Sequence, residues 1–367
     1  MKIECGKEKL KWALTIAEKI TGKNLSLSAL SYVLLEAEKN LLGISATNLD
    51  IGVKLSIPAK TEKTGSLLVS GSVLVNLLAN LYKEDKIQLE AINNNLAVSS
   101  FNNSSILKSY PRDDFPALPQ LSDSPALFLP AEILVNGLRS VSYAAALSDI
   151  KPEIASVYLY GVDKQLVFVS TDSFRLAEKR IDQGTGSVLD FKLIIPIRNA
   201  LEVIRVFEGV STEVQVTYAH HEMSFTSPGV YLVSRLVEGV FPDYQQIISS
   251  SFKTGVVVLK TELQNAIKIS SVFADKFNQV ALKIQPRESV CEIISQNSDV
   301  GENTARLEAT LQGEELELNF NAKYLLDCFS ALTADSVSLQ FNGKSRPIIV
   351  SGVGDGTFRY LIMPLNR

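Results

Sequence analysis

The sequence has 367 residues, of which 46% are hydrophobic and 21% are charged, and its formal net charge at pH 7 is −4. This balance excludes an intrinsically disordered chain and indicates about two or three globular domains. The acidic net charge also excludes a protein that coats nucleic acid with its whole surface, while a local basic face stays compatible with it.

A helix opens the sequence, and a strand–helix–strand unit follows it. Apolar residues recur at helical spacing over residues 9–19, which predicts the first helix. Residues 69–89 predict a short strand, an amphipathic helix and a second strand. Between these two regions, alternating apolar residues predict strands over 32–35 and 41–46.

The same order of elements occurs three times. The strand–helix–strand unit returns over residues 195–216 and 320–339, so its starts at 69, 195 and 320 are 126 and 125 residues apart. The opening helix returns over 132–145 and 262–273. A nearly constant period outranks any single motif as evidence of architecture, and it predicts three tandem domains. The predicted apolar helix faces comprise Leu10, Leu14, Ala17, Val75, Leu78, Leu81, Leu134, Leu138, Val141, Leu201, Ile204, Phe207, Leu263, Ile267, Ser270, Leu326, Phe329 and Leu332.

Short strands fill the space between the helices. Residues 157–169 alternate around a predicted hairpin turn at 161–164, and strands are also expected over 231–236 and 358–363. Many short antiparallel strands with two helices on one face form a two-layer α+β domain. We therefore predict the α+β class for each of the three units.

Each unit ends with a proline, which stops strand pairing. The three endings are Phe115-Pro116, Phe241-Pro242 and Met363-Pro364. Stretches rich in proline and serine follow the first two endings and read as linkers. We predict domains over residues 1–121, 122–250 and 251–367.

Two helices per domain give six helices per chain. If helices spaced about 9 Å apart line a ring, six leave no useful hole, whereas twelve helices from two chains leave an opening on the order of 25 Å. A DNA duplex, roughly 20 Å across, would pass through that opening. The geometry favours a ring of two copies around double-stranded DNA.

Positive charge on the predicted helices is weak and mixed with negative charge. Arg139, Arg198 and Arg205 lie on later helices, where Glu132 and Glu202 offset them. Dispersed charge suits a sliding contact with the phosphate backbone, because strong base contacts would hold the protein at one site. Ordinary solvated helix faces explain the pattern equally well.

Signals for catalysis are weak. His220 and His221 are predicted on one strand, where neighbours point to opposite faces, so they cannot share a metal or a triad. Residues 351–356 are glycine-rich but lack the ending of a phosphate loop, and we predict a hairpin turn there. Asp172 near Arg175 could act as an acid–base pair, which leaves an enzyme on a threefold scaffold as the alternative.

The cysteines and the N-terminus bear on location. Cys5, Cys291 and Cys328 are odd in number and far apart, so we expect no disulfide framework, no metal site and a reducing compartment. The N-terminus lacks the order of a signal peptide, and no apolar run reaches membrane length. We expect a soluble cytoplasmic protein without membrane contact, metal or cofactor.

Three segments resemble a known family. Residues 170–177, Ser-Thr-Asp-Ser-Phe-Arg-Leu-Ala, resemble the signature Ala-Thr-Asp-Gly-His-Arg-Leu-Ala of bacterial DNA polymerase III beta subunits, the sliding clamps. Residues 236–244, Leu-Val-Glu-Gly-Val-Phe-Pro-Asp-Tyr, and 360–365, Tyr-Leu-Ile-Met-Pro-Leu, are similar to two other segments of that family. The resemblance covers the full length of the chain.

The resemblance implies a fold, a function and partners. The fold would be three tandem domains of the DNA clamp fold, closed as a head-to-tail homodimeric ring around duplex DNA. Such a ring would tether the replicative polymerase during DNA replication, as a non-catalytic processivity factor of the DNA polymerase III holoenzyme. The implied partners are double-stranded DNA, the DNA polymerase III alpha subunit, other polymerases, an ATP-driven clamp loader and repair proteins.

The resemblance also implies binding residues. A hydrophobic pocket between the second and third domains would take a short peptide from these partners, with Arg175 and Thr171 fixing its polar groups. The pocket residues would be Ile154, Thr171, Ser173, Phe174, Arg175, Leu176, Pro242, Gln246, Ile247, Leu361, Met363, Pro364 and Leu365. DNA contacts are predicted at Lys11, Lys23, Arg139, Ser148, Arg198 and Arg205. The dimer interface would join Val272 and Phe273 of one copy to Leu77 and Leu81 of the other.

Several of these residues leave alternatives open. Taken singly, Ile154 and Leu361 fit an inter-domain core better than a binding site, and Phe273 fits a core equally well. Ser173-Phe174 stands where the family usually has Gly-His, and Gln246 stands where a basic residue is common. The peptide preference of this chain therefore stays open.

Overall fold

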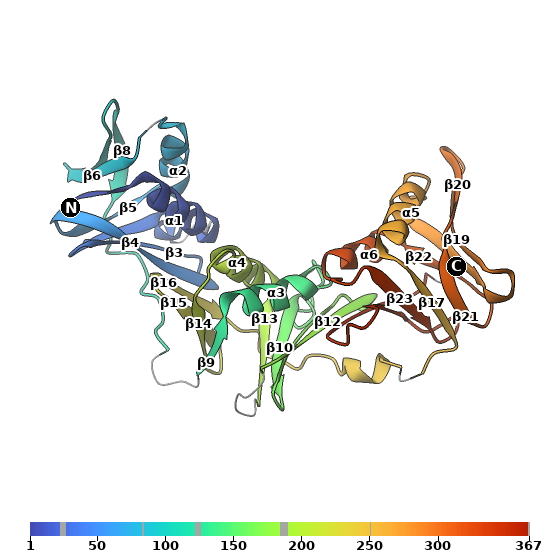
Figure 1. The fold of residues 1–367 in the computed structure, drawn as a ribbon. Helices are drawn as coiled ribbons and strands as arrows, with labels where there is room; N and C mark the ends of the chain where they lie inside the picture. The colour runs from blue at the N-terminus through green and yellow to red at the C-terminus, as the bar shows by residue number, and fades with distance from the viewer. Residues whose placement is uncertain (23–26, 83, 122–125, 184–189, 250, 366–367) are drawn as a thin grey trace. The chain divides into compact units, whose positions relative to one another are not determined.

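The computed structural model describes residues 1–22, 27–82, 84–121, 126–183, 190–249 and 251–365. The chain divides into two compact units. One is formed by residues 1–134 and 202–236, and the other by residues 135–201 and 237–367. Figure 1 shows the helices and strands of both units. Two helices, α3 (Ala131–Ser142) and α4 (Ile197–Phe207), have residues in each unit.

The first unit is built around one antiparallel sheet. Its elements are β1 (Lys2–Gly6), α1 (Lys7–Ile20), the 3-10 helix η1 (Ser28–Ser31), β2 (Val33–Glu38), β3 (Leu41–Thr47), β4 (Ile51–Lys63), β5 (Gly65–Val69), α2 (Gly71–Asn80), β6 (Lys86–Ile92), β7 (Asn95–Ser99), β8 (Ser104–Tyr110), β9 (Ala126–Pro130), β14 (Glu213–Tyr218), β15 (Glu222–Ser227) and β16 (Val230–Arg235). Among the described residues the sheet order is β1-β6-β7-β8-β5-β2-β3-β4-β16-β15-β14-β9, and β1 also pairs with β4. Helix α1 packs on α2, β3 and β4 (Figure 1).

The second unit contains two antiparallel sheets. Its elements are β10 (Ser156–Val162), β11 (Gln165–Thr171), β12 (Arg175–Asp182), β13 (Phe191–Pro196), β17 (Thr254–Leu259), α5 (Lys260–Val272), β18 (Gln279–Gln285), β19 (Val290–Asn297), β20 (Gly301–Arg306), β21 (Ala309–Gly313), β22 (Leu316–Asn321), α6 (Ala322–Asp327), β23 (Ser336–Phe341), β24 (Ile348–Gly352) and β25 (Phe358–Ile362), with 3-10 helices η2 (Tyr244–Ile247), η3 (Pro286–Glu288) and η4 (Cys328–Ser330). In the described part of the chain the sheet orders are β13-β10-β11-β12-β25-β24-β23-β17-β21 and β20-β19-β18-β22. Helix α5 packs on α6, β19 and β20.

The three opening helices bury the faces that their spacing predicts. In α1, Leu10, Leu14 and Ala17 are fully buried. The corresponding residues of α3 and α5 are buried too, including the small polar Ser270. These faces pack on antiparallel strands, which confirms the α+β class.

In the second helix of each repeat, the buried face starts one residue earlier than predicted. The buried residues at this position are Leu74, Ala200 and Leu325. Of the predicted residues, Leu201 is 47% exposed, and Val75 and Leu326 are half-buried. Two adjacent apolar residues both fit a spacing of three or four, so the pattern alone does not fix the rotation of these helices.

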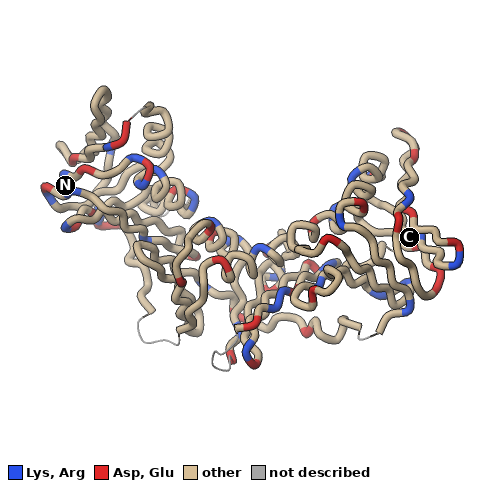
Figure 2. The backbone as a smooth tube through the Cα atoms, in the orientation of Figure 1, with Lys and Arg blue, Asp and Glu red and all other residues tan. Residues whose placement is uncertain are grey.

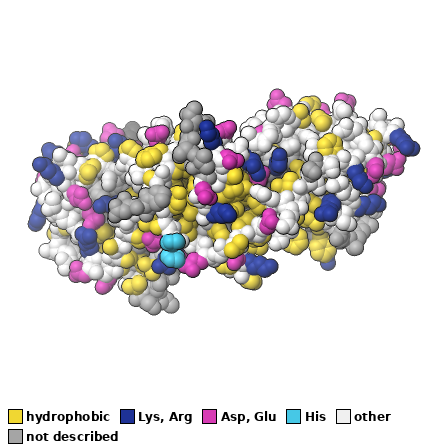
Figure 3. Space-filling model, turned by 90° about the horizontal axis from the view of Figure 1, so that it is seen from below, with side chains coloured by type: hydrophobic (Ala, Val, Ile, Leu, Met, Phe, Trp, Pro, Cys, Tyr) yellow, Lys and Arg dark blue, Asp and Glu magenta, His cyan; other side chains and the backbone are white. Residues whose placement is uncertain are grey.

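The predicted turns are confirmed, and one predicted strand is wrong. Asp163 and Lys164 form the turn between β10 and β11, and residues 353–357 join β24 to β25 in a hairpin. His220 and His221 lie in the turn between β14 and β15 instead of on a strand, because the hairpin reverses there. Both are exposed, with ring centroids 6.2 Å apart, and Figure 3 shows them together at the surface.

No helix in the described residues combines the length and the apolar character that spanning a membrane requires.

Candidate functional site

Two strand pairs link segments from different predicted domains. In the first unit β4 pairs with β16, and in the second unit β12 pairs with β25. We call these pairs the first junction and the second junction. Gly52 lies opposite Val233 in the first junction, and Leu176 lies opposite Leu361 in the second.

The first junction starts from a tight turn before β4. The Thr47 hydroxyl donates a hydrogen bond to the Ile51 carbonyl at 2.9 Å. The side-chain oxygen of Asn48 accepts hydrogen bonds from the amides of Asp50 and Ile51 at 3.0 and 2.9 Å. Leu49 has a left-handed backbone with φ +78°, a conformation that costs free energy in a residue other than glycine.

The second junction starts from the same turn before β12. The Thr171 hydroxyl donates to the Arg175 carbonyl at 2.7 Å. The Oδ1 atom of Asp172 accepts from the amides of Phe174 and Arg175, both at 2.9 Å. Ser173 has φ +77°, which matches Leu49. The two turns therefore have the same pattern of hydrogen bonds.

One backbone hydrogen bond ties each turn to the end of the partner strand, and the side chains beside it differ. Arg235 donates to the Asp50 carbonyl at 2.8 Å, and Met363 donates to the Phe174 carbonyl at 2.8 Å. In the first junction these side chains are charged. In the second they are apolar, and Phe174 and Met363 are 61% and 36% exposed.

Two apolar residues of a neighbouring segment are also exposed. Pro242 and Ile247 flank Tyr244, and Ile247 is 42% exposed. We call Phe174, Met363, Pro242 and Ile247 the junction surface. Exposed apolar side chains beside a rigid strand pair are typical of a site that binds an apolar partner.

A buried cluster supports the junction surface. Leu176 and Leu361 are 2% and 1% exposed and pack with Phe241 and Tyr244. Both leucines were predicted in the pocket, and the structure places them in this buried cluster. Their membership in a peptide site stays a prediction.

Tyr244 anchors the segment that carries Pro242 and Ile247. Its hydroxyl donates to Glu178 Oε2 at 2.6 Å and lies 2.8 Å from the Tyr160 hydroxyl. Glu178 is buried and also accepts from Arg180 Nε at 2.9 Å. Burial, together with the negative charge of Glu178, raises the pKa of Tyr244. The tyrosine therefore stays neutral and keeps its hydrogen bond over the whole physiological range.

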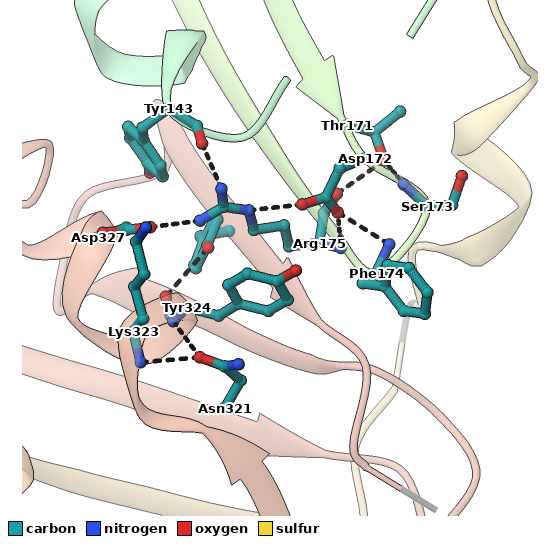
Figure 4. A network of polar contacts seen from close by, with 11 residues as sticks. Tyr143, Thr171, Asp172, Ser173, Phe174, Arg175, Asn321, Lys323, Tyr324 and Asp327 are labelled. Atoms are coloured by element: carbon teal, nitrogen blue, oxygen red, sulfur yellow. Dashed lines mark hydrogen bonds and ion pairs between the residues drawn. The ribbon is translucent and has the colours of Figure 1, made fainter. Parts of the chain in front are cut away.

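The predicted role of Arg175 in holding a peptide's polar groups stays a prediction. The side chain is only 9% exposed, and three of its N–H groups donate to acceptors inside the protein. Nε donates to Asp172 Oδ2 at 2.9 Å, Nη2 donates to the Tyr143 carbonyl at 2.6 Å, and Nη1 donates to Asp327. Figure 4 shows these contacts converging on the guanidinium. Thr171 is likewise buried and closes the turn.

The other predicted pocket residues occupy varied positions. Ile154 is half-buried, and its carbonyl accepts from Ala146 at 3.0 Å. The amide of Gln246 donates to Asp243 at 2.7 Å. Pro364 is buried and Leu365 is half-buried, after the end of β25, while Ser173 is exposed in the turn. Their membership in a peptide site remains a prediction.

Two of the predicted DNA contacts are engaged in ion pairs. Arg198 contacts Asp149 at 2.8 Å, and Arg205 contacts Glu202 at 2.6 Å. Arg198, Glu202 and Arg205 lie on α4, and Asp149 contacts that helix through Arg198. Figure 2 shows basic and acidic residues interspersed along the chain. Pairing with carboxylates reduces the net positive charge that each arginine offers to phosphate.

The remaining predicted DNA contacts differ in exposure. Lys11 is half-buried on α1, and Arg139 is exposed on α3. Ser148 is exposed in the loop after α3, where its hydroxyl accepts from Ile150 N at 3.4 Å. Lys23 lies outside the described residues.

The predicted dimer residues also differ in how exposed they are. Leu77 lines a groove of about 560 Å³ between α2 and β8, beside Val73 and Ile106. Val272 is 65% exposed at the end of α5, and Phe273 follows it half-buried. Leu81 is only 6% exposed, so it belongs to the core of its own unit because it closes the buried face of α2.

The sequence prediction did not locate two free strand edges. Within the described residues, β20 pairs only with β19, and residues 104–108 of β8 pair only with β7. Ile106 on β8 is 71% exposed. The repeat could have located both edges, because β20 corresponds to β4 and β12, and β8 corresponds to β16 and β25.

The described residues show no group of His, Cys, Asp and Glu side chains that could hold a metal ion. Asp172 uses Oδ1 for the turn and Oδ2 for Arg175, so the acid–base alternative loses its free carboxylate. All three cysteines are buried and reduced.

Comparison with known proteins agrees with this geometry. Models of the N-terminal, central and C-terminal domains of the DNA polymerase III beta subunit match residues 1–119, 128–243 and 245–366. The chain is 29% identical to the beta sliding clamp of Synechocystis sp. over 389 residues, covering 100% of this chain and 99% of the relative. The solved DNA polymerase III beta subunit of Thermotoga maritima superposes with a TM-score of 0.93 at 25% identity, with 100% of this chain and 99% of that chain covered. The solved sliding clamp of Bacillus subtilis gives 0.94 at 24% identity and the same coverage, which shows the same fold.

Proposed function

This chain belongs to the family of bacterial DNA polymerase III beta subunits, the sliding clamps, and from this premise we propose that two copies close head to tail into a ring around duplex DNA. Clamps of this family are processivity subunits of DNA polymerase and are in general non-catalytic. We extend this to the present chain, which acts by holding the polymerase on its template and not by chemistry.

The observation that carries the ring is the repeated junction. Each internal junction joins a strand that follows a tight turn to the last strand of the next domain. Strands β20 and β8 occupy these two places in the repeat, and their edges are free among the described residues. A free edge is a template for pairing with another chain. A third junction between β20 of one copy and β8 of its partner would use both edges.

The internal junctions also predict the register of the third. Asn297 accepts from the amide two residues later at 2.9 Å, as Asn48 does, so Gln296 corresponds to Thr47. Gln296 pairs with Glu302 as Thr47 pairs with Gly52.

Leu107 lies eight residues before Phe115, as Val233 lies eight residues before Phe241. Because Gly52 lies opposite Val233, Glu302 should lie opposite Leu107 of the partner. Thr304 then lies opposite Ser105.

A ring of this kind would hold DNA by topology. The charges on α1, α3 and α4 are partly compensated, which permits sliding because few phosphates are neutralised at a time. Lys11, Arg139 and Ser148 are the described candidates for such contacts, with Arg198 and Arg205 contributing through the exposed sides of their ion pairs.

We propose that the junction surface takes a short apolar peptide segment from the DNA polymerase III alpha subunit, other polymerases and the clamp loader. Its support is the contrast at one backbone hydrogen bond, where Phe174 and Met363 are apolar and exposed while Asp50 and Arg235 are charged. A rigid strand pair with a buried floor suits a peptide that binds through a few apolar side chains.

The ring is tested on plasmid DNA. Loaded protein should be retained on a nicked circle during gel filtration and should be lost when the plasmid is linearised, because a topological link slips off a free end. Equal retention on both forms would refute the ring and would indicate a chemical contact with DNA.

A further inference from the structure

Arg175 is a largely buried charge whose donors are shared among three separate segments. Its side chain is 9% exposed. Nε reaches Asp172 of its own turn, Nη2 reaches the carbonyl of Tyr143 after α3, and Nη1 reaches Asp327 at the end of α6. The guanidinium carbon also lies 4.3 Å from the ring centroid of Tyr324 on α6 (Figure 4). One side chain thus joins the turn to a helix that lies 152 residues away in the sequence.

The contacts form a continuous path from α6 to the exposed Phe174. Asp327 holds the guanidinium, and the guanidinium holds Asp172 through Oδ2 at 2.9 Å. The other oxygen of Asp172 accepts from the Phe174 amide at 2.9 Å. Charge-assisted hydrogen bonds from a planar guanidinium to separate acceptors fix its orientation as well as its distance from each of them.

The turn itself does not require this network. In the first unit the equivalent turn has Asn48 in place of Asp172 and Ile51 in place of Arg175. It closes with the same hydrogen bonds, at 3.0 and 2.9 Å from Asn48, and has the aliphatic Ile51 at the position of the guanidinium. The partly buried ion pairs of the second unit are therefore additional to what the turn needs. Burying a charge is costly unless it is paired, so a network beyond the needs of folding calls for another role.

We propose that Asp327 and Tyr324 of α6 are positioning residues, which act through Arg175 to hold the turn and its Phe174 in the geometry that binds the peptide. This inference rests on the proposed peptide-binding function of the junction surface. Asp327 acts on the same backbone that Met363 contacts, since Met363 donates to the Phe174 carbonyl at 2.8 Å. Release of Asp327 frees the turn to move relative to Met363 and weakens the site without removing any residue of the junction surface.

The experiment is a cycle of variants measured with one labelled peptide. The probe is a fluorescein-labelled synthetic peptide with the clamp-binding segment of the cognate DNA polymerase III alpha subunit. Asp327→Ala should weaken its binding about tenfold, with Asp327→Asn intermediate because it keeps an acceptor. Glu317→Gln, at an exposed position of β22, is the matched control and should leave affinity unchanged.

The cycle separates positioning from general destabilisation. In the Asp172→Asn, Arg175→Ile background, which copies the turn of the first unit, Asp327→Ala should have no further effect on affinity. Hydrogen exchange at residues 171–175 should accelerate in Asp327→Ala, while residues 47–51 of the same molecules provide the internal control and should not change.

The outcomes are distinguishable. If the unmodified protein binds no peptide, the proposed peptide function fails. If it binds and Asp327→Ala binds equally well, or if the loss is as large in the double-variant background, the positioning role is refuted. A lower melting temperature with unchanged exchange at residues 171–175 would also refute it.

Discussion

The first and second junctions have the same backbone and different surfaces. Both begin with a threonine-closed turn, both place a residue with a left-handed backbone at its tip, and both end in a hydrogen bond of 2.8 Å from the end of the partner strand. The first junction surrounds that bond with Asp50 and Arg235. The second surrounds it with Phe174 and Met363, which are exposed.

The linker residues differ in a corresponding way. Leu118 lies over Gly52 in the first junction, where an added Cβ would meet it at 2.5 Å. At the equivalent place in the second junction, Tyr244 reaches the buried Glu178. The same strand pairing thus occurs twice, once with charged side chains at the shared hydrogen bond and once with exposed apolar side chains. Side chains, not topology, make that difference.

The largest effect should come from giving the second junction the side chains of the first. The double variant Phe174→Asp, Met363→Arg should lower peptide affinity by roughly a hundredfold or more, because each of the two apolar side chains contributes roughly 1.5 to 3 kcal/mol when fully buried. Isothermal titration with the polymerase peptide measures it. The reciprocal variant Asp50→Phe, Arg235→Met is the control, and unchanged binding by Phe174→Asp, Met363→Arg would place the site elsewhere.

Changes in the buried cluster around Leu361 should alter the stability of the protein. Leu361→Ala removes a residue that is 1% exposed, and should lower the free energy of unfolding by about 2 to 5 kcal/mol. Met363→Ala, at a position that is 36% exposed, should change the midpoint of urea unfolding little and reduce peptide affinity. A large loss of stability in Met363→Ala, with little loss in Leu361→Ala, would contradict these assignments.

Removing the anchor hydroxyl should have a smaller effect with a defined pH dependence. Tyr244→Phe should lower the free energy of unfolding by about 1 to 3 kcal/mol, because it removes the hydrogen bond that the Tyr244 hydroxyl donates to the buried Glu178. The fold raises the pKa of Tyr244 above its ordinary value of 10.0, so this stabilisation is complete below pH 10 and is lost as the pH rises further. The difference in unfolding free energy should stay constant from about pH 6 to 9. A difference that grew above pH 10 would contradict the assignment.

The smallest effect concerns the first unit. Trp12, the sole tryptophan in the sequence, is 42% exposed on α1 near Lys9 and Lys11. If α1 faces the duplex, loading onto a nicked circle should shift or quench the fluorescence of Trp12, and raised salt should reduce the change. Identical spectra with and without loaded DNA would show that α1 faces away from it.

The sequence predicts the repeat, the helices and the turns because these depend on local spacing. The family motifs also point to Phe174 and Met363, and the structure shows that both are exposed. Spacing cannot reveal that Asp327 meets Arg175, because the two are 152 residues apart and no periodic pattern relates them. Nor can it show that Arg198 and Arg205 are paired with carboxylates, or that Leu81 is buried by its own unit. Those outcomes depend on tertiary packing.

A third junction between two copies would repeat the first two, and cysteine cross-linking can detect its register. Residues directly opposite on antiparallel strands have Cα atoms about 4.5 to 5.5 Å apart, within the range of a disulfide. The native cysteines give little background, because all three are buried and burial raises the pKa of Cys5 to about 12 and that of Cys291 to about 11. Under mild oxidation, Ser105→Cys with Thr304→Cys should yield a covalently closed dimer, while Ser105→Cys with Glu302→Cys, two residues out of register, should not. Equal cross-linking of both pairs, or none in either at concentrations where the dimer forms, would contradict the third junction.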